Sequence, residues 1–292
     1  MLAPKLGLVS CNKEPKRASV NLGRPLSRKA RAQMIDIHCH PLPQTDDGPK
    51  TFEEAVEMLK MAAADGTTHL VATPHCNYKY AFKPAENRTK LEALQEAVGE
   101  KPKLLLGCDF HLYYENIRQL VEDRGSFTIN QSDYVLVEFG DQFVPEQMDR
   151  VFYEIECAGL IPILTHPERN PVFSRKPELL HRWVTRGCLC QITAKSLTGG
   201  FSREAQHLAE GWLGQNLVHF FASDAHDLKH RPPILSECYR KIAETKGEDT
   251  AKRLLETNPE CVINNRRLPP GPEPLELAPR KPKRKWFALF RS

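Results

Sequence analysis

The sequence predicts an α/β protein, a distorted TIM-like (β/α)7 barrel that lacks one strand–helix unit of the full TIM barrel. Short β-rich runs alternate with amphipathic helical segments from Met34 onward, and this alternation implies parallel strands joined by helical crossovers. About seven such units over about 230 residues suit a barrel of this kind. A doubly wound open sheet is the structural alternative.

Seven segments are predicted as strands because they are short and rich in aliphatic or β-branched residues. Alternate side chains of a strand share one face, so His38 and His40, at the end of the first segment, converge on one point. The predicted strands are 34–38, 68–73, 103–107, 134–139, 161–165, 188–193 and 218–223.

The intervening segments have helical spacing of apolar residues. The first predicted helix opens with a Thr51-x-x-Glu54 capping box and ends at Gly66, which are start and stop signals of a helix. Further helices are predicted over 85–98, 113–123, 145–158, 175–186, 202–214 and 234–246.

Charge divides the chain into three parts. The net charge is +4, but residues 1–33 contribute +7 and residues 266–292 contribute +6, which leaves −9 for residues 34–265. The acidic body argues against a nucleic-acid partner, because phosphate backbones need a basic surface. The acidic body could still bind an anionic group if metal ions neutralised some of its carboxylates.

The two ends are predicted to lie outside the folded domain, residues 34–265. Residues 1–33 lack apolar periodicity and are predicted to be a disordered basic extension, with Met34 as an alternative translation start. Residues 266–292 form a Pro-rich basic tail. Its RKPKRKWFALF stretch suits peripheral contact with an anionic membrane or a protein partner; an unordered, solvated tail is the other interpretation.

The sequence favours a cytoplasmic protein. The basic, aromatic tail would also allow peripheral contact at the inner membrane. No apolar stretch approaches the roughly 20 residues that span a bilayer, and no secretory signal is evident. The nine Cys residues have no framework spacing and are predicted to be reduced thiols.

Polar residues recur where the predicted strands end. Six of the seven strands deliver a His or a carboxylate at the carboxyl end, which is where barrel active sites are built. Asp46 is predicted to be a turn residue, and Cys39, Cys76 and Cys108 to be packing residues. The candidate ligands are His38, His40, Asp47, His75, Asp109, Glu138, His166, Asp224 and His226.

This donor set predicts a cluster of divalent metal ions. Imidazoles and carboxylates without a well-placed thiolate suit Mn²⁺, Zn²⁺ or Fe²⁺, and the number of ligands implies about two or three ions. Arg169 and Arg231 follow two of the same strands. A guanidinium fork binds phosphate bidentately, so these two residues are the predicted phosphate clamp.

The stretches MIDIHCHPLPQTDDGPKTFEEAVEMLKMAAADGTTHLVATPH, THPERN and SDAH resemble the PHP (polymerase and histidinol phosphatase) superfamily. The nearer resemblance is to its bacterial protein-tyrosine phosphatases of capsule and exopolysaccharide synthesis, and it spans about residues 34–265. It implies a distorted (β/α)7 barrel with a trinuclear, often manganese-dependent centre held by the nine candidate ligands. The family places a bridging Glu where this chain has Asp109, which implies a looser bridge and lowered or retuned activity.

The resemblance implies a phosphatase that hydrolyses phosphotyrosine by a metal-activated water, with a tyrosine kinase of polysaccharide biosynthesis as the substrate. C-x5-R spacing occurs at Cys11 and Cys261, neither of which stands at the end of a predicted strand; a route without a cysteinyl phosphate is what the resemblance implies. Two alternatives stay open. One is a PHP phosphoesterase for a small phosphate ester such as histidinol phosphate or a nucleotide; the other is a non-catalytic scaffold that binds phosphotyrosine.

Overall fold

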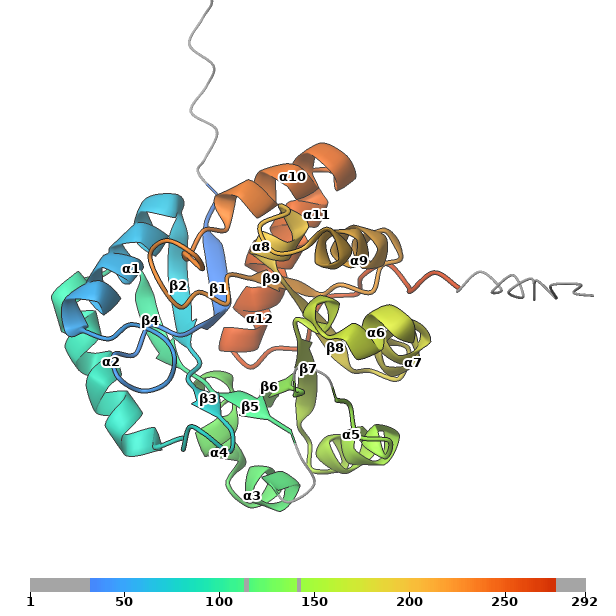
Figure 1. Cartoon of the computed structure of the whole chain (residues 1–292), viewed down its shortest axis with the longest axis horizontal. Helices are drawn as coiled ribbons and strands as arrows, with labels where there is room; N and C mark the ends of the chain where they lie inside the picture. The colour runs from blue at the N-terminus through green and yellow to red at the C-terminus, as the bar shows by residue number, and fades with distance from the viewer. Residues whose placement is uncertain (1–31, 113–115, 141–142, 277–292) are drawn as a thin grey trace, which may run out of the picture. The chain divides into compact units, whose positions relative to one another are not determined.

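The computed structural model describes residues 32–112, 116–140 and 143–276 (Figure 1). The prediction of an α/β fold with parallel strands is confirmed, but the described strands form two sheets instead of one. The first sheet has the order β1–β2–β4: Met34–Cys39, Thr67–Ala72 and Lys103–Leu106. The second has the order β3–β5–β6–β7–β8–β9: His75–Cys76, Asp109–His111, Tyr134–Glu138, Ile161–Thr165, Leu189–Thr193 and Phe220–Ala222.

Two predicted strands run on, after a break, into the second sheet. β2 is followed by β3 beyond Pro74, and β4 by β5 beyond Gly107. A Cβ atom on Gly107 would lie 3.0 Å from Cγ1 of Val71, so glycine permits the close approach of the two segments there. Beyond the breaks, His75 and Asp109 lie opposite each other in register. The breaks therefore bring two candidate ligands together.

Backbone hydrogen bonds connect the carboxyl end of β1 with the segment that follows β9. Asp224 N donates to His38 O at 2.8 Å, and His40 N donates to Ala225 O at 2.9 Å. Cys39 and Ala225 form an isolated parallel bridge. These contacts join the first and last strands in the chain at the end where the candidate ligands lie. Closure of a full barrel stays a prediction.

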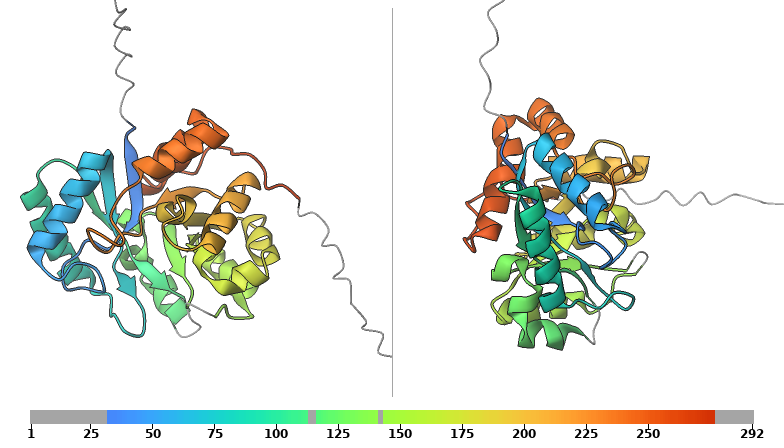
Figure 2. Two further views of the ribbon diagram at one scale, coloured as in Figure 1. Left: turned by 45° about the horizontal axis from the view of Figure 1, so that its top comes forward. Right: turned by 90° about the vertical axis from the view of Figure 1, so that its left-hand side faces the viewer.

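The helices lie around the outside of the strands (Figures 1 and 2). One departure from prediction lies near Pro177: the helix predicted over 175–186 begins only at Glu178, and a separate short helix, Pro171–Arg175, precedes it. The helices near predicted positions are α1 Phe52–Asp65, α2 Pro84–Val98, α3 Ile117–Glu122, α5 Met148–Cys157, α6 Pro171–Arg175, α7 Glu178–Val184, α9 Arg203–Gly214 and α10 Ser236–Lys246.

Some short helices were not predicted. Pro259 lies in the first turn of one of them, where the backbone N–H that proline lacks is not needed. Residues 113–115 of the helix predicted over 113–123 lie outside the described residues. The additional elements are α4 Arg124–Phe127, α8 Ala194–Leu197, α11 Glu248–Lys252, a π-helical turn over Arg253–Thr257, and α12 Asn258–Ile263.

The capping signals of the first helix are confirmed. The Thr51 side chain accepts a hydrogen bond from Glu54 N at 3.2 Å. The Glu54 carboxylate accepts one from Lys50 N at 3.0 Å, one residue before the position of an ideal capping box. Gly66 ends the helix with φ of 115°, a left-handed conformation that glycine adopts without a steric penalty.

Apolar residues of both sheets pack into one core cluster in the interior. Ile35, Ile37, Val71, Leu136 and Ile163 belong to it, and all five are buried. At about 25 cal/mol per Å² of buried apolar surface, such side chains each stabilise the fold by about 1.5–3 kcal/mol. The core therefore fixes the strands whose ends carry the polar residues.

The first part of the predicted tail lies against the body. Tyr134 Oη donates to Arg266 O at 2.8 Å, and Leu275 N donates to Gln215 O at 3.0 Å. The RKPKRKWFALF stretch and residues 1–31 lie outside the described residues. Within the described part, no helix has both the length and the apolar character that membrane crossing requires.

Candidate metal centre

The structure brings all nine candidate ligands together, but His75 and Asp109 are the first residues of β3 and β5 and do not stand at the carboxyl end of a strand. Within each of four overlapping groups, the potential ligand atoms lie within 4.8 Å of one another. The groups share members, so the candidate sites adjoin. They are His40, Asp47, His75 and His226; His38, His40 and Asp109; His38, His166 and Asp224; and His75, Asp109 and Glu138.

His38 and His40 converge as their spacing predicts. Both side chains are fully buried, and their Nε2 atoms lie 3.1 Å apart. The Nδ1 atom of each histidine contacts a side-chain oxygen: Gln191 Oε1 lies 2.9 Å from His38 Nδ1, and Asp46 Oδ2 lies 2.7 Å from His40 Nδ1. Partners of this kind fix the tautomer and leave Nε2 free to bind a metal ion.

Asp46 is the turn residue that was predicted, and it also contacts the centre. Its Oδ1 accepts from Gly48 N at 3.0 Å, and its Oδ2 accepts from His75 N at 3.1 Å. A Cβ on Gly48 would lie 2.3 Å from His40 O, so the loop needs glycine there. Asp46 thus positions two candidate ligands, a role that its place in a turn did not reveal.

Asp224 lies between the candidate ligands and both predicted clamp residues. Its Oδ2 pairs with Arg169 Nη1 and with Arg231 Nη2. Its Oδ1 lies 3.5 Å from Nε2 of His38 and of His40. The carboxylate therefore fixes the two guanidinium groups at the edge of the cluster.

Two candidate ligands have backbone conformations that side chains rarely adopt. His166 has φ of 32° and Asp224 has φ of 51°. Non-glycine residues in the left-handed region cost about 1–3 kcal/mol each and concentrate at functional sites. The strained backbone of these two residues is consistent with a functional role.

His75 joins the fully buried part of the cluster to its open side. Its Nδ1 lies 3.0 Å from Asp109 Oδ2 and 3.4 Å from Glu138 Oε2. Its Nε2 lies 3.4 Å from Asp47 Oδ1, which is also 3.3 Å from His226 Nε2. Asp109 is fully buried, whereas the side chain of Asp47 is 48% exposed. The cluster is thus accessible from one side.

The carboxylates of the cluster differ in their protonation behaviour. Burial raises the pKa of Asp109 and of Asp224, but the imidazoles around Asp109 and the arginines and imidazoles around Asp224 outweigh it, so both pKa values lie well below the usual range. Burial and the neighbouring Asp109 raise the pKa of Glu138 to about 7. Burial lowers the pKa of His40 to about 3, so this imidazole is neutral and available as a ligand.

The donor set fits metal ions. Asp109 Oδ1 and Asp224 Oδ1 are buried and have no hydrogen-bond partner within the described residues. A buried carboxylate oxygen without a partner is costly, and a divalent cation would supply the missing interaction. Imidazole and carboxylate donors are those that Mn²⁺, Zn²⁺ and Fe²⁺ accept.

Sequence reasoning missed the contacts that position the arginines. The Arg169 guanidinium carbon lies 4.8 Å from the ring centroid of Phe201, a cation–π contact. Lys195 Nζ donates to His230 O, beside Arg231. Phe201 lies away from any strand end, and Lys195, two residues beyond β8, is neither an imidazole nor a carboxylate, so the pattern that found the ligands does not include them.

Six further histidines belong to none of the four groups: His69, His111, His181, His207, His219 and His230. The Nδ1 atom of His111 nevertheless lies 4.0 Å from Glu138 Oε2. Cys39 and Cys108 are buried, as predicted for packing residues, and burial raises the pKa of both thiols. Cys76 is half-buried.

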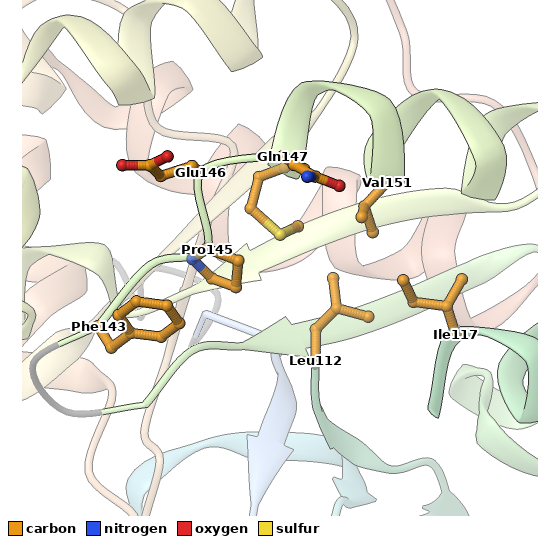
Figure 3. A pocket seen from close by; sticks show the side chains of 8 residues that line it. Leu112, Ile117, Phe143, Pro145, Glu146, Gln147 and Val151 are labelled. Carbon is orange, nitrogen blue, oxygen red and sulfur yellow. The ribbon is translucent and has the colours of Figure 1, made fainter. Parts of the chain in front are cut away.

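An apolar cavity of about 490 Å³ lies elsewhere, between the end of β5 and helices α3 and α5 (Figure 3). None of the nine candidate ligands lines it. Its lining residues are Leu112, Ile117, Phe143, Pro145, Glu146, Gln147, Met148 and Val151. The cavity is therefore separate from the candidate metal centre.

Parallel strands that bring together a cluster of imidazoles and carboxylates define an α/β protein with a candidate metal site. The family model for capsular polysaccharide synthesis, CpsB/CapC, matches residues 34–264. The chain belongs to this CpsB/CapC family.

Several relatives are similar over nearly their whole length. CapC of Staphylococcus aureus is 34% identical over 261 residues, which cover 88% of this chain and 100% of CapC. The tyrosine-protein phosphatase YwqE of Bacillus subtilis is 34% identical over 246 residues, covering 82% of this chain and 96% of YwqE. The tyrosine-protein phosphatase CpsB of Streptococcus pneumoniae is 29% identical over 240 residues, covering 79% and 98%.

The fold is also similar to solved structures. A structure from a study of YwqE of Bacillus subtilis and CpsB of Streptococcus pneumoniae, described as metal-dependent tyrosine phosphatases, superposes with a TM-score of 0.78 at 32% identity, covering 84% of this chain and 100% of that chain. The phosphotriesterase homology protein of Escherichia coli has a TM-score of 0.54 at 7% identity, covering 80% and 99%. The second likeness concerns the fold alone.

Proposed function

We propose that this chain is a metal-dependent protein-tyrosine phosphatase. The proposal depends mainly on one observation: Asp224 fixes two arginines at the edge of a cluster of nine candidate metal ligands. Divalent ions bound in such a cluster activate a water molecule and neutralise charge on a phosphoryl group. Membership of the CpsB/CapC family, which includes named tyrosine-protein phosphatases, supports the same activity.

The arginines are the proposed phosphate-binding residues. The side chains of Arg169 and Arg231 are 30% and 22% exposed, so their guanidinium groups can reach a phosphate that arrives from solvent. Both would bind non-bridging phosphate oxygens and stabilise the charge that develops there. Asp224 keeps both fixed before the substrate arrives, which lowers the cost of orienting them.

The proposed centre contains two or three ions, a number that follows from the surplus of ligands over what one ion takes. Mn²⁺ is the proposed metal, with Zn²⁺ and Fe²⁺ as alternatives. Gln191 and Asp46 would hold His38 and His40 in the tautomers that present Nε2 to the metal. All nine candidate ligands are proposed to bind these ions.

Asp109 provides a test of the bridging role. Its Oδ2 lies 3.5 Å from His38 Nε2 and 3.0 Å from His75 Nδ1. Asp109 is thus a member of two of the ligand groups. We expect Asp109→Glu, which restores the longer carboxylate of the family pattern, to fold normally and to show equal or higher activity. Metal content and phosphate release are measured together; a variant that loses metal would contradict the bridging assignment.

Further proposals concern the setting of the enzyme. We propose that the folded domain, residues 34–265, closes as a distorted (β/α)7 barrel of PHP type, in keeping with the contacts between β1 and the segment after β9. The proposed substrate is a bacterial tyrosine kinase of polysaccharide biosynthesis. The proposed location is the cytoplasm, with residues 280–290 making peripheral contact at the inner membrane.

A small phosphate ester such as histidinol phosphate is the second candidate substrate. Asp47 is 48% exposed on the open side of the cluster, which favours a protein segment over a small ligand that would be enclosed. Comparing kcat/KM for a phosphotyrosyl peptide and for histidinol phosphate separates the two. We expect the peptide to be preferred; preference for histidinol phosphate would contradict the proposal, and hydrolysis of neither would favour a scaffold.

A further inference from the structure

We propose that the turn Asn77–Tyr80 is a substrate-recognition element, which binds an acidic side chain close to the phosphotyrosine of a polypeptide. The inference rests on the proposed phosphatase activity and adds the kind of sequence that the enzyme selects. The turn follows His75, a candidate metal ligand, by two residues. It therefore borders the place where the phosphate would bind.

The turn has a defined shape. Asn77 Oδ1 accepts hydrogen bonds from Lys79 N and from Tyr80 N, each at 2.9 Å. Asn77 N donates to Tyr80 O at 3.0 Å. An Asn side chain that bonds to the backbone two and three residues on stabilises a tight turn. Tyr78 and Lys79 are thus presented at the tip in a fixed arrangement, which lowers the entropy lost on binding.

One ring of the turn lies against the metal centre. The Tyr80 ring is parallel to the His75 imidazole, with an angle of 13° between the planes and centroids 6.1 Å apart. His75 Nε2 in turn lies 3.4 Å from Asp47 Oδ1. A substrate whose phosphate reaches this centre would therefore pass within reach of the turn.

The tip of the turn has the chemistry of a peptide contact. Tyr78 is 90% exposed, and exposed aromatic side chains are enriched where polypeptides bind. Lys79 is exposed as well, and its Nζ lies 4.6 Å from the centroid of the Tyr80 ring. In the described part of the chain, Lys79 forms no salt bridge with a carboxylate.

Charge decides which side chain the turn would select. Residues 34–265 carry a net charge of −9, but the open edge of the centre presents Lys79 on one loop and Arg169 and Arg231 on others. The contact with Tyr80 raises the pKa of Lys79, with Asp47 contributing, so the ammonium stays charged. Complementary charge steers and selects a partner; an Asp or Glu beside the phosphotyrosine is the complement of Lys79.

The test compares two phosphotyrosyl peptides that differ only in flanking Glu or Lys, with p-nitrophenyl phosphate as a substrate that has no flanking residues. For the unaltered protein we expect a higher kcat/KM on the Glu peptide. Lys79→Glu should lower the ratio of Glu-peptide to Lys-peptide kcat/KM by about fivefold to tenfold, mainly through KM. Lys60→Glu is the matched control, because it makes the same change in net charge at a residue on α1 that is 58% exposed.

Tyr78→Ala should lower kcat/KM on both peptides relative to p-nitrophenyl phosphate, with Tyr153→Ala, an exposed tyrosine on α5, as its control. The inference is wrong if Lys79→Glu leaves the peptide ratio unchanged or alters it no more than Lys60→Glu does. Failure of the unaltered protein to hydrolyse either peptide, while it remains folded, would instead contradict the proposed function itself.

Discussion

Asp224→Asn is expected to lower the rate of phosphate release by about a thousandfold or more, the largest effect of any single substitution considered. Asp224 Oδ2 pairs with Arg169 and Arg231, while its Oδ1 faces His38 and His40. Asparagine keeps the size of the side chain but removes its charge. The substitution therefore weakens metal binding and releases both arginines at once.

The variant should contain less metal as well as being less active. A buried carboxylate that loses its charge leaves two guanidinium groups without their partner, which costs about 3–5 kcal/mol of stability where the pair is buried. Thermal unfolding is therefore measured beside activity and metal content. Asp149→Asn is the control, because Asp149 pairs with Arg182 and Arg186 away from the centre. Full metal content and activity within tenfold of normal would contradict the role assigned to Asp224.

Arg169→Ala is expected to lower kcat by about a hundredfold to a thousandfold while leaving the metal content unchanged. The Arg169 guanidinium is held between Asp224 and the ring of Phe201, and it is not itself a ligand. Its removal takes away charge stabilisation at the phosphate. Because that charge develops most in the transition state, kcat should fall more than KM rises.

Arg169→Lys should restore little activity, since an ammonium lacks the planar fork that binds two phosphate oxygens. Arg175→Ala is the matched control: Arg175 lies six residues on, at the end of α6, and its Nε donates to Pro171 O. Steady-state kinetics and metal analysis of the three variants separate the possibilities. Normal kcat in Arg169→Ala would remove Arg169 from the clamp.

The candidate ligands were predictable because parallel strands gather their carboxyl ends at one edge. His38, Glu138 and Asp224 are up to 186 residues apart, yet each stands at or just beyond the end of a strand. The capping signals of α1 and the alternation of strands and helices were also predictable, because both depend on local sequence.

The contacts behind the ligands were not predictable from such local patterns. Gln191 meets His38 across 153 positions of sequence, and this contact depends on the position of β8 relative to β1. The break between β4 and β5 of the two sheets falls at Gly107, where a Cβ atom would lie 3.0 Å from Val71 Cγ1. Neither the spacing of apolar residues nor the composition of the strands carries that information.

Phosphotyrosine hydrolysis by this protein should require metal bound by the cluster. The direct measurement is phosphate release from a phosphotyrosyl peptide by the chelator-treated protein, followed during back-titration with Mn²⁺ while bound metal is counted. We expect no release without metal and activity that rises with occupancy to about two or three ions per chain. Undiminished release by a folded, metal-free protein would contradict it.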